Sequence, residues 1–272
     1  MKVYISADIE GVSGLAHPAE ANPAAAESAA FRAQMTAEVA AACDGAFAAG
    51  ASEVLIKDAH GPGRNLDVGA LLAPANGSLR VIRGWSGHPF GMVEGIDPSF
   101  SHAVFVGFHA AAGSAGHPLA HTISGRRFSR LRLNGATASE FLLYSLAAAS
   151  VGVPVVFVSG DRTVCEEARA AVEGIVTVAT GEGVGHAVYA LTFAEVLRRI
   201  RNGVQEAVAR APMSARSMPR EFALTVEYLR AADAYAMSFY PGARQTAERE
   251  LELRTSDYLA VLTFLRIASR MP

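Results

Sequence analysis

The chain opens with Val3-Tyr4-Ile5-Ser6-Ala7-Asp8-Ile9-Glu10-Gly11-Val12-Ser13-Gly14, an apolar segment that runs into a glycine-rich loop. The segment Val3–Ala7 is typical of a buried strand, and two carboxylates, one residue apart, follow it directly. Ionised carboxylates are costly in a poorly solvated place unless a cation or several hydrogen-bond donors offset them. No basic cluster lies nearby in the sequence. The pattern therefore indicates a metal ion at the end of this strand.

Short β-rich segments alternate with longer helical patterns through the first two-thirds of the chain. The predicted strands are Val3–Ala7, Glu53–Ile56, Leu79–Ile82, Ala103–Gly107 and Val155–Ser159. The predicted helices are Ala24–Gly50, Asn65–Leu72, Ser139–Ser150 and a helix that Asp161 caps and that runs through Val172. This alternation predicts the α/β class, with three αβα layers and a largely parallel sheet covered on both faces.

Two further parts depart from this alternation. The segment Arg130–Leu133, followed by Asn134-Gly135, predicts a hairpin extension. The last third predicts an α+β part, with helices Phe193–Ala211 and Asp257–Ser269 and strands Phe222–Tyr228 and Glu248–Thr255. We expect residues 1–272 to form a single unit, with the turn at residues 212–219 as the best candidate for an internal boundary.

Composition excludes several classes of protein. The net charge of −2 is spread along the chain, which argues against a nucleic-acid binder, because such a protein needs a basic face. The apolar stretches at residues 40–49 and 141–149 are too short to span a membrane, and no targeting segment is visible. Cys43 and Cys165 lie far apart in apolar surroundings, so we expect both to be reduced and buried in a cytoplasmic protein.

Metal-ligand side chains recur at the ends of the predicted strands. Asp8 and Glu10 follow the first strand, His60 follows the second, and His109 follows the strand Ala103–Gly107. The carboxyl ends of parallel strands share one edge of a sheet, where binding sites form. Alone, an aspartate after a strand is usually a turn or cap residue, and a loop histidine usually lies on the surface. Their convergence at successive strand ends favours a metal site.

Three other residues are ambiguous from the pattern alone. Glu140 begins an alanine- and leucine-rich helix, where a carboxylate is also favourable simply because of the helix dipole. His117 and His121 lie in a loop that contains glycines and a proline. Either histidine could be a catalytic imidazole beside a metal site, and either could be a surface residue.

At these residues the chain resembles the M55 family of D-aminopeptidases, which are dinuclear zinc peptidases of the DppA type. The matching segments are Ser6–Leu15, Asp58-Ala59-His60-Gly61, Met92-Val93-Glu94-Gly95, Val106–Ala110, Ala120-His121-Thr122, Asn134-Gly135 followed by Glu140, and Ser159-Gly160-Asp161. The resemblance runs over nearly the whole chain and is weaker after Thr177.

The resemblance implies two zinc ions in each subunit. Asp8 would bridge them, with Glu10 and His109 completing one site and His60 and Glu140 completing the other. His121 matches the family's catalytic histidine. We favour an acid–base or oxyanion-stabilising role for His121 over that of a nucleophile, because a zinc-bridged hydroxide already supplies the attacking group.

The function that the resemblance implies is a metal-dependent aminopeptidase. It would use a zinc-bridged hydroxide to hydrolyse short peptides with a free amino terminus, and the preferred substrates would carry D-amino acids of the D-Ala type. The expected partners are a small peptide substrate and further copies of the same chain in a ring-built oligomer, a decamer by analogy. Neither nucleic acid nor a membrane is expected as a partner.

One departure from the family pattern keeps other functions open. Lys57 stands where the family commonly carries asparagine, and it could pair with Asp58 or touch the substrate. Asp58 itself is better placed to orient ligands than to bind metal. A first alternative is therefore a metallo-amidase that acts on L-configured or non-peptide substrates. A second alternative is a non-catalytic protein that binds a small peptide.

Overall fold

The computed structural model describes residues 1–210 and 214–270, which contain two β-sheets. The larger sheet has seven strands in the order β3-β2-β1-β4-β7-β8-β9, and every neighbouring pair is parallel except β8 and β9. Its strands are β1 (Lys2–Ala7), β2 (Glu53–Asp58), β3 (Ser78–Ile82), β4 (His102–Phe108), β7 (Val155–Asp161), β8 (Val176–Val184) and β9 (Ala187–Ala190). The predicted strands of the first two-thirds all belong to this sheet.

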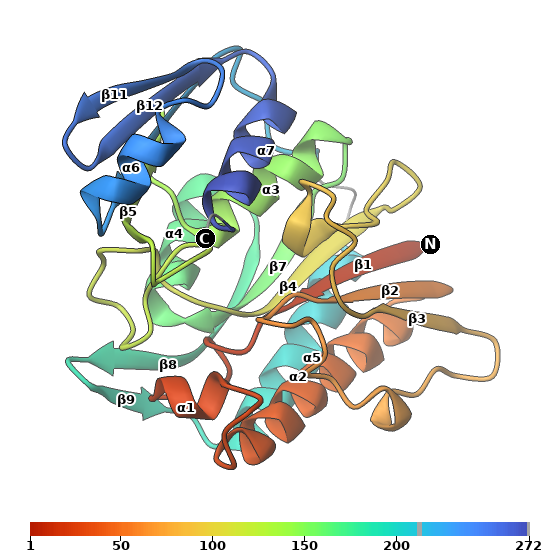
Figure 1. The fold of residues 1–272 in the computed structure, drawn as a ribbon. Coiled ribbons are helices and arrows are strands. Elements are labelled where there is room, and N and C mark those ends of the chain that lie inside the picture. Colours follow the sequence, from red (N-terminus) through yellow and green to blue (C-terminus); the bar gives the residue numbers. More distant parts are fainter. Residues whose placement is uncertain (211–213, 271–272) are drawn as a thin grey trace.

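Helices cover both faces of the larger sheet, which makes three αβα layers (Figure 1). One face carries α2 (Ser28–Ala48) and α5 (Phe193–Ala209), and the other carries α3 (Glu140–Ser150) and α4 (Arg162–Ala171). The short helix α1 (Pro18–Ala21) packs against α2. The predicted α/β fold with a largely parallel sheet is thus confirmed.

The central strands are apolar on both sides because each of their faces is buried under helices. Side chains of β1 alternate between two hydrophobic cores, with Tyr4 in the core under α3 and α4. Val3 and Ile5 lie in the core under α2 and α5. A strand buried on both faces needs a continuous apolar run, and Val3–Ala7 supplies one.

The smaller sheet joins the predicted hairpin to the C-terminal part of the chain. It is antiparallel, in the order β11-β12-β10-β5-β6. Its strands are β5 (Phe128–Leu133), β6 (Ala136–Thr137), β10 (Phe222–Tyr228), β11 (Ala243–Ala247) and β12 (Glu250–Thr255), with helices α6 (Ala231–Met237) and α7 (Tyr258–Ala268) beside them. Residues 212 and 213 of the predicted boundary lie outside the described residues, so the division of the chain into units stays a prediction.

Some local predictions were wrong. The segment Asn65–Leu72 forms only a short 3-10 turn at Val68–Ala70, because Asp58 instead binds the backbone N–H groups of Asn65 and Leu66. The hairpin of β8 and β9 was not predicted. Cys43 and Cys165 are free and buried, as expected, while the cytoplasmic location stays a prediction. In the described part of the chain, every helix is too short or too polar to cross a bilayer.

Two glycines let the loop after β1 lie against the end of β4. The N–H of Gly11 donates to the Gly107 carbonyl at 2.8 Å, and the N–H of Asp8 donates to the Val106 carbonyl at 2.8 Å. A Cβ on Gly11 would stand 1.8 Å from the Phe108 oxygen, and one on Gly107 would stand 2.3 Å from the Asp8 oxygen. Only residues without a side chain allow this approach, which brings the two strand ends together.

We expect Gly107→Ala to destabilise the protein by roughly 1–3 kcal/mol more than Gly152→Ala, because its new Cβ overlaps the Asp8 backbone. Gly152 is the matched control, since its φ of +79° is close to the +72° of Gly107 but its Cβ would meet nothing within 4 Å. Urea unfolding of both variants measures the difference. Equal losses of unfolding free energy would contradict the steric argument.

Candidate metal centre

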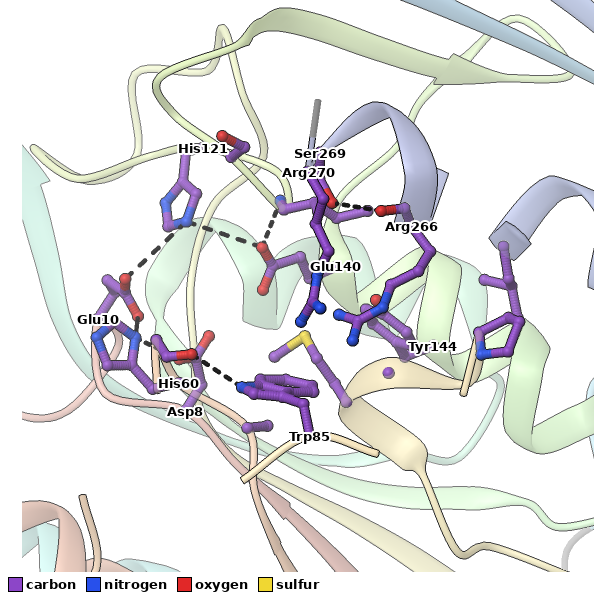
Figure 2. Close-up of a pocket in the computed structure, with 18 residues that line it drawn as sticks. Asp8, Glu10, His60, Trp85, His121, Glu140, Tyr144, Arg266, Ser269 and Arg270 are labelled. Carbon is purple, nitrogen blue, oxygen red and sulfur yellow. Dashed lines mark hydrogen bonds and ion pairs between the residues drawn. The ribbon is translucent and has the colours of Figure 1, made fainter. Parts of the chain in front are cut away.

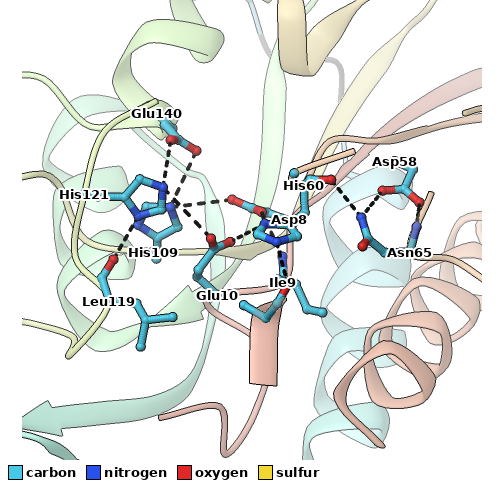
Figure 3. A network of polar contacts seen from close by, with 12 residues as sticks. Asp8, Ile9, Glu10, Asp58, His60, Asn65, His109, Leu119, His121 and Glu140 are labelled. Carbon is cyan, nitrogen blue, oxygen red and sulfur yellow. Dashed lines mark hydrogen bonds and ion pairs between the residues drawn. The ribbon is translucent and has the colours of Figure 1, made fainter. Parts of the chain in front are cut away.

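Five ligand-type side chains meet at the carboxyl edge of the larger sheet (Figure 3). Asp8 and Glu10 follow β1, His60 follows β2, and His109 follows β4. Glu140 is the first residue of α3, next to the N-cap Ser139. The side chains are almost fully buried: relative exposure is 2% for Asp8, 6% for Glu10, 1% for His109 and 5% for Glu140. His60 is the most exposed of the five.

Asp8 lies at the centre of the cluster, and its two oxygens face opposite sides. Oδ1 is 3.2 Å from His60 Nδ1, and Oδ2 is 3.6 Å from His109 Nε2. Glu10 Oε2 lies 2.8 Å from the same His60 nitrogen. On the other side, Glu140 Oε2 lies 3.5 Å from His109 Nε2. One carboxylate thus stands between two histidines, each of which has a second carboxylate beside it.

When the rings of His60 and His109 are neutral, each directs its unprotonated nitrogen toward these carboxylates. His60 Nε2 lies 2.9 Å from the Ala21 carbonyl, and His109 Nδ1 lies 2.9 Å from the Ala110 carbonyl. Because a carbonyl oxygen can only accept, these nitrogens must carry the hydrogens. The remaining nitrogens then present lone pairs to carboxylate oxygens. Two lone pairs face each other favourably only with a proton or a cation between them.

The carboxylates hold the histidines toward the protonated state. Burial opposes charge on His60, but Glu10 and Asp8 outweigh it and raise the pKa of His60 well above its usual 6.5. Burial of His109 is likewise outweighed by Glu140, Glu10 and Asp8, and its pKa is also raised. Burial and the charge of Glu10 raise the pKa of Asp8 well above 3.8. The cluster demands positive charge, which protons or metal ions can supply.

The donor set fits metal ions better than protons alone. His109 Nε2 is buried and has no hydrogen-bond partner among the described residues, and a buried polar atom without a partner is costly. Imidazole nitrogens and carboxylate oxygens are the ligands that zinc takes in proteins. Three groups of ligand atoms each lie within 4.8 Å of one another: Asp8, Glu10 and His60; Asp8, His109 and Glu140; and Glu10, His109 and His121.

These three groups agree only in part with the ligand arrangement that the resemblance implies. Asp8 belongs to two groups, which suits a bridging ligand. Glu10 shares a group with His109, as the resemblance implies. In the described part of the chain, however, His60 and Glu140 share none, because they flank Asp8 on opposite sides.

Two other carboxylates hold the ligand loops through backbone hydrogen bonds. Asp58 accepts from Asn65 N, Asn65 Nδ2 and Leu66 N, and Asn65 Nδ2 also donates to the His60 carbonyl at 2.8 Å. Asp161 caps α4 at Val164 N and also accepts from Ala110 N, next to His109. Asp58 therefore positions the loop of His60 rather than touching its ring.

Glu140 is fixed from two directions. The Ser139 side chain caps α3 by accepting from Leu142 N at 2.9 Å, and Glu140 Oε1 accepts from Ile123 N at 2.6 Å. Ile123 has a φ of 64°, which is unusual for a β-branched residue and costs of order 1–3 kcal/mol. The strained backbone thus aims its N–H at the carboxylate and leaves Oε2 for His109.

The two ambiguous histidines have different environments. His117 accepts from Leu119 N and donates to the Leu15 carbonyl, and its pKa is lowered to about 4, chiefly by burial. It is a neutral residue that orders the loop. His121 stacks on His109 with centroids 4.3 Å apart. Its Nε2 lies 3.9 Å from Glu10 Oε1 and 3.8 Å from Glu140 Oε1, so it borders the cluster.

Lys57 does not pair with Asp58, contrary to one of the two expectations. Its ammonium is fully buried, donates to the Gly84 carbonyl and lies 3.9 Å from Glu94 Oε2. It also lies 4.1 Å from the centroid of the Trp85 ring. Lys57 does not line either cavity beside the cluster. Of the residues that it contacts, Trp85 lines the smaller cavity.

The cluster separates two cavities, and Glu10, His60, Gly61 and His121 line both. The smaller cavity holds about 300 Å³ and extends toward α7 (Figure 2). Trp85, Met92, Ile123, Tyr144, Arg266 and Arg270 are among its lining residues. The larger cavity holds about 740 Å³. It is bordered by four prolines, which are Pro18, Pro23, Pro62 and Pro118.

Sequence analysis missed the walls of the smaller cavity. Trp85 follows β3 as His60 follows β2, so its strand-end position was a usable signal. Arg266 lies inside the predicted closing helix Asp257–Ser269, and Arg270 comes directly after it. No pattern in the sequence, however, relates the closing helix to the carboxyl edge of the sheet.

Comparisons with known proteins agree with one another. A model of the peptidase M55 family, described as D-aminopeptidase, matches residues 1–267. A D-aminopeptidase of Bacillus subtilis (strain 168) is 29% identical over 277 residues, which cover 99% of this chain and 98% of that relative. The solved structure of the Zn-dependent D-aminopeptidase DppA from Bacillus subtilis, described as a self-compartmentalizing protease, superimposes with a TM-score of 0.90. It is 27% identical, with 100% of this chain and 99% of that chain covered.

We expect Asp8→Ala to lose all bound metal, because Asp8 belongs both to the three-ligand group that contains His60 and to the one that contains Glu140. Metal analysis after dialysis against zinc and gel filtration measures the metal content. Asp97→Ala is the control, since Asp97 is an exposed carboxylate near Lys2, at the amino-terminal edge of the sheet opposite the cluster. Full zinc content in Asp8→Ala would contradict the bridging position of Asp8.

Proposed function

The chain belongs to the peptidase M55 family of D-aminopeptidases, and from this premise we propose that it is a zinc-dependent D-aminopeptidase. It would remove the amino-terminal residue from short peptides, with D-Ala-type peptides as the preferred substrates. The observation that carries the proposal is the buried set of five ligand side chains beside a cavity. A relative of known fold with 27% identity is described as zinc-dependent, which supports zinc as the metal.

We propose that each subunit holds two zinc ions. Asp8, Glu10 and His60 would hold one, and Asp8, His109 and Glu140 the other. Three carboxylates offset three of the four positive charges of two zinc ions, and neutral imidazoles add none. A nearly neutral cluster is compatible with the burial of these side chains. When bound, zinc lowers the pKa of water toward about 7 and polarises a carbonyl group.

His121 is the residue best placed to move a proton. Its Nδ1 donates to the Leu119 carbonyl at 2.8 Å, which fixes the ring and leaves Nε2 directed toward Glu10 and Glu140. The residue is partly exposed and lines both cavities. A substrate spanning the cluster would therefore meet Nε2 at the scissile bond. There Nε2, which is bare in the neutral ring, could take a proton from the attacking water and, in the charged ring, pass it to the leaving amine or donate to the developing oxyanion.

We propose that the amino terminus of the substrate binds at the carboxylates. Glu10 is the strongest candidate, because neither of its oxygens accepts a backbone hydrogen bond in the described residues, and Oε1 faces the cavities beside His121. A positively charged amine near Glu10 would place the first peptide bond close to His121. This arrangement favours an aminopeptidase over an endopeptidase.

The self-compartmentalizing description of the structural relative supports a homo-oligomer, and we propose a ring-built one, a decamer by analogy. Large apolar side chains are exposed around α6, where Leu229 is 44%, Tyr235 62% and Phe239 71% exposed. Such side chains suit contacts between subunits. Light scattering measures the mass in solution, and a monomeric mass would refute this part of the proposal.

We expect the purified protein to hydrolyse D-Ala-D-Ala and D-Ala p-nitroanilide, and to act far more slowly on the L-enantiomers. EDTA should abolish the activity and added zinc should restore it, because the three buried carboxylates depend on the metal for charge balance. Initial rates across the four substrates measure both effects.

Other outcomes of this screen identify the alternatives. A preference for L-substrates would support a metallo-amidase of different specificity. Activity that EDTA leaves unchanged would refute metal dependence. Binding of dipeptides without hydrolysis, in protein with its full metal content, would support a peptide-binding protein.

We expect His121→Ala to keep its zinc and to lose roughly 10²–10⁴-fold in kcat, the usual contribution of a general acid or base. His117→Asn is the control, because that neutral histidine orders the same loop but has no ion pair with a carboxylate within 4.0 Å among the described residues. Metal analysis and steady-state kinetics measure the two properties. A His121→Ala enzyme with normal kcat would show that another group transfers the proton.

A further inference from the structure

Two guanidinium groups stand on the wall of the smaller cavity that faces away from the sheet. Arg266 lies in the last turn of α7, Arg270 lies in the turn that follows the helix, and both line the cavity. Figure 2 shows their side chains extending into the space beside Glu140, Tyr144 and Trp85. The cavity therefore has carboxylates and histidines at one end and two cations at the other.

These two arginines differ from most charged side chains of the protein. Many surface arginines pair with a carboxylate, as Arg162, Arg199 and Arg254 do at 2.8, 2.7 and 2.8 Å. Within residues 1–210 and 214–270, neither Arg266 nor Arg270 has an ion pair within 4.0 Å. Arg266 Nη2 is buried and has no hydrogen-bond acceptor among the described residues.

An unpartnered, buried guanidinium nitrogen calls for an acceptor from outside the chain. Leaving a buried donor unsatisfied is costly, and more so for a charged group. The Trp85 ring lies 5.8 Å from Arg266 Cζ and supplies only a weak cation–π contact. Burial and the charge of Arg270 both lower the pKa of Arg266. An anion between the two arginines would relieve both effects.

The shape of the cavity limits what that anion can be. Its volume of about 300 Å³ is at the low end of the roughly 300–1,000 Å³ of small-molecule sites. Apolar side chains, among them Met92, Ile123 and Leu262, also line this cavity. A ligand that fills this space carries an amine at the metal end, a short uncharged middle and an anion at the arginine end. A guanidinium matches a carboxylate with two parallel hydrogen bonds.

We propose that Arg266, supported by Arg270, binds the free carboxyl terminus of the substrate. This inference rests on the proposed aminopeptidase function and refines it. The cavity would then select peptides by length, because the amine of the substrate must reach the metal end while its carboxylate reaches the arginine end. The enzyme would then favour dipeptides with a free carboxylate over their amides.

The test compares D-Ala-D-Ala with D-Ala-D-Ala amide in the zinc-loaded enzyme. We expect the wild type to prefer the free acid. Arg266→Gln should lower kcat/KM for the acid about 10–100-fold, as expected for a hydrogen bond to a charged group. It should change the amide less than about threefold. The loss should appear mainly in KM, because the contact is present in the ground state and in the transition state alike.

Two matched variants make the result specific. Arg266→Lys keeps the charge but not the two-pronged geometry, so it should restore part of the acid preference. Arg201→Gln removes one positive charge from the exposed face of α5 and should leave the acid-to-amide ratio unchanged. Zinc content and the thermal midpoint of each variant show whether the fold and the metal centre are intact.

Several outcomes would overturn the inference. Equal kcat/KM for acid and amide in the wild type would refute it and leave the aminopeptidase function standing. An equal loss for both substrates in Arg266→Gln would show a merely structural role at the helix end. Loss of the acid preference in Arg126→Gln instead would place the carboxylate in the larger cavity, which Arg126 lines. Hydrolysis of neither substrate by the wild type would refute the proposed function, and this inference with it.

Discussion

Three buried carboxylates at one sheet edge repel one another unless positive charge lies between them. Asp8, Glu10 and Glu140 are at least nine-tenths buried, and the two ligand histidines face them with nitrogens that are bare when the rings are neutral. Protons on the histidines can supply part of the charge, as their raised pKa values indicate. Metal ions can supply all of it. The architecture around the cluster serves to hold these groups together despite their repulsion.

The same edge of the sheet carries carboxylates of two kinds, and hydrogen bonding separates them. Asp58 and Asp161 accept several backbone N–H groups and so need no cation. In the described residues, Asp8 Oδ2, Glu140 Oε2 and both oxygens of Glu10 receive no backbone donor. The first kind orders the loops, and the second kind keeps oxygens that could bind a metal ion. Residue type alone does not distinguish the two kinds, because each position is an acid after a strand or at a helix start.

The cavity beside the cluster has a charge at each end. Carboxylates and histidines form the end at the sheet, and Arg266 of α7 with Arg270 just after the helix forms the other. Because α7 belongs to the part of the chain that packs with the smaller sheet, that part helps to build the cavity. Lys57 lies 4.1 Å from the centroid of the Trp85 ring, which borders the cavity, so the departure from the family pattern lies next to the cavity wall and outside the candidate ligand set.

Local pattern determined the strands, the largely parallel sheet and the strand-end positions of Asp8, Glu10, His60 and His109. Apolar segments and glycines predict the strands and their ends from a few neighbouring residues. Because the carboxyl ends of parallel strands share one edge of a sheet, the strand-end residues are then predicted to lie close together. Only the tertiary structure decided that Glu140 faces His109 rather than merely capping a helix, and that His121 rather than His117 borders the cluster. It alone brought Arg266 opposite the carboxylates. Contacts between residues of different elements depend on how those elements pack, which no local pattern records.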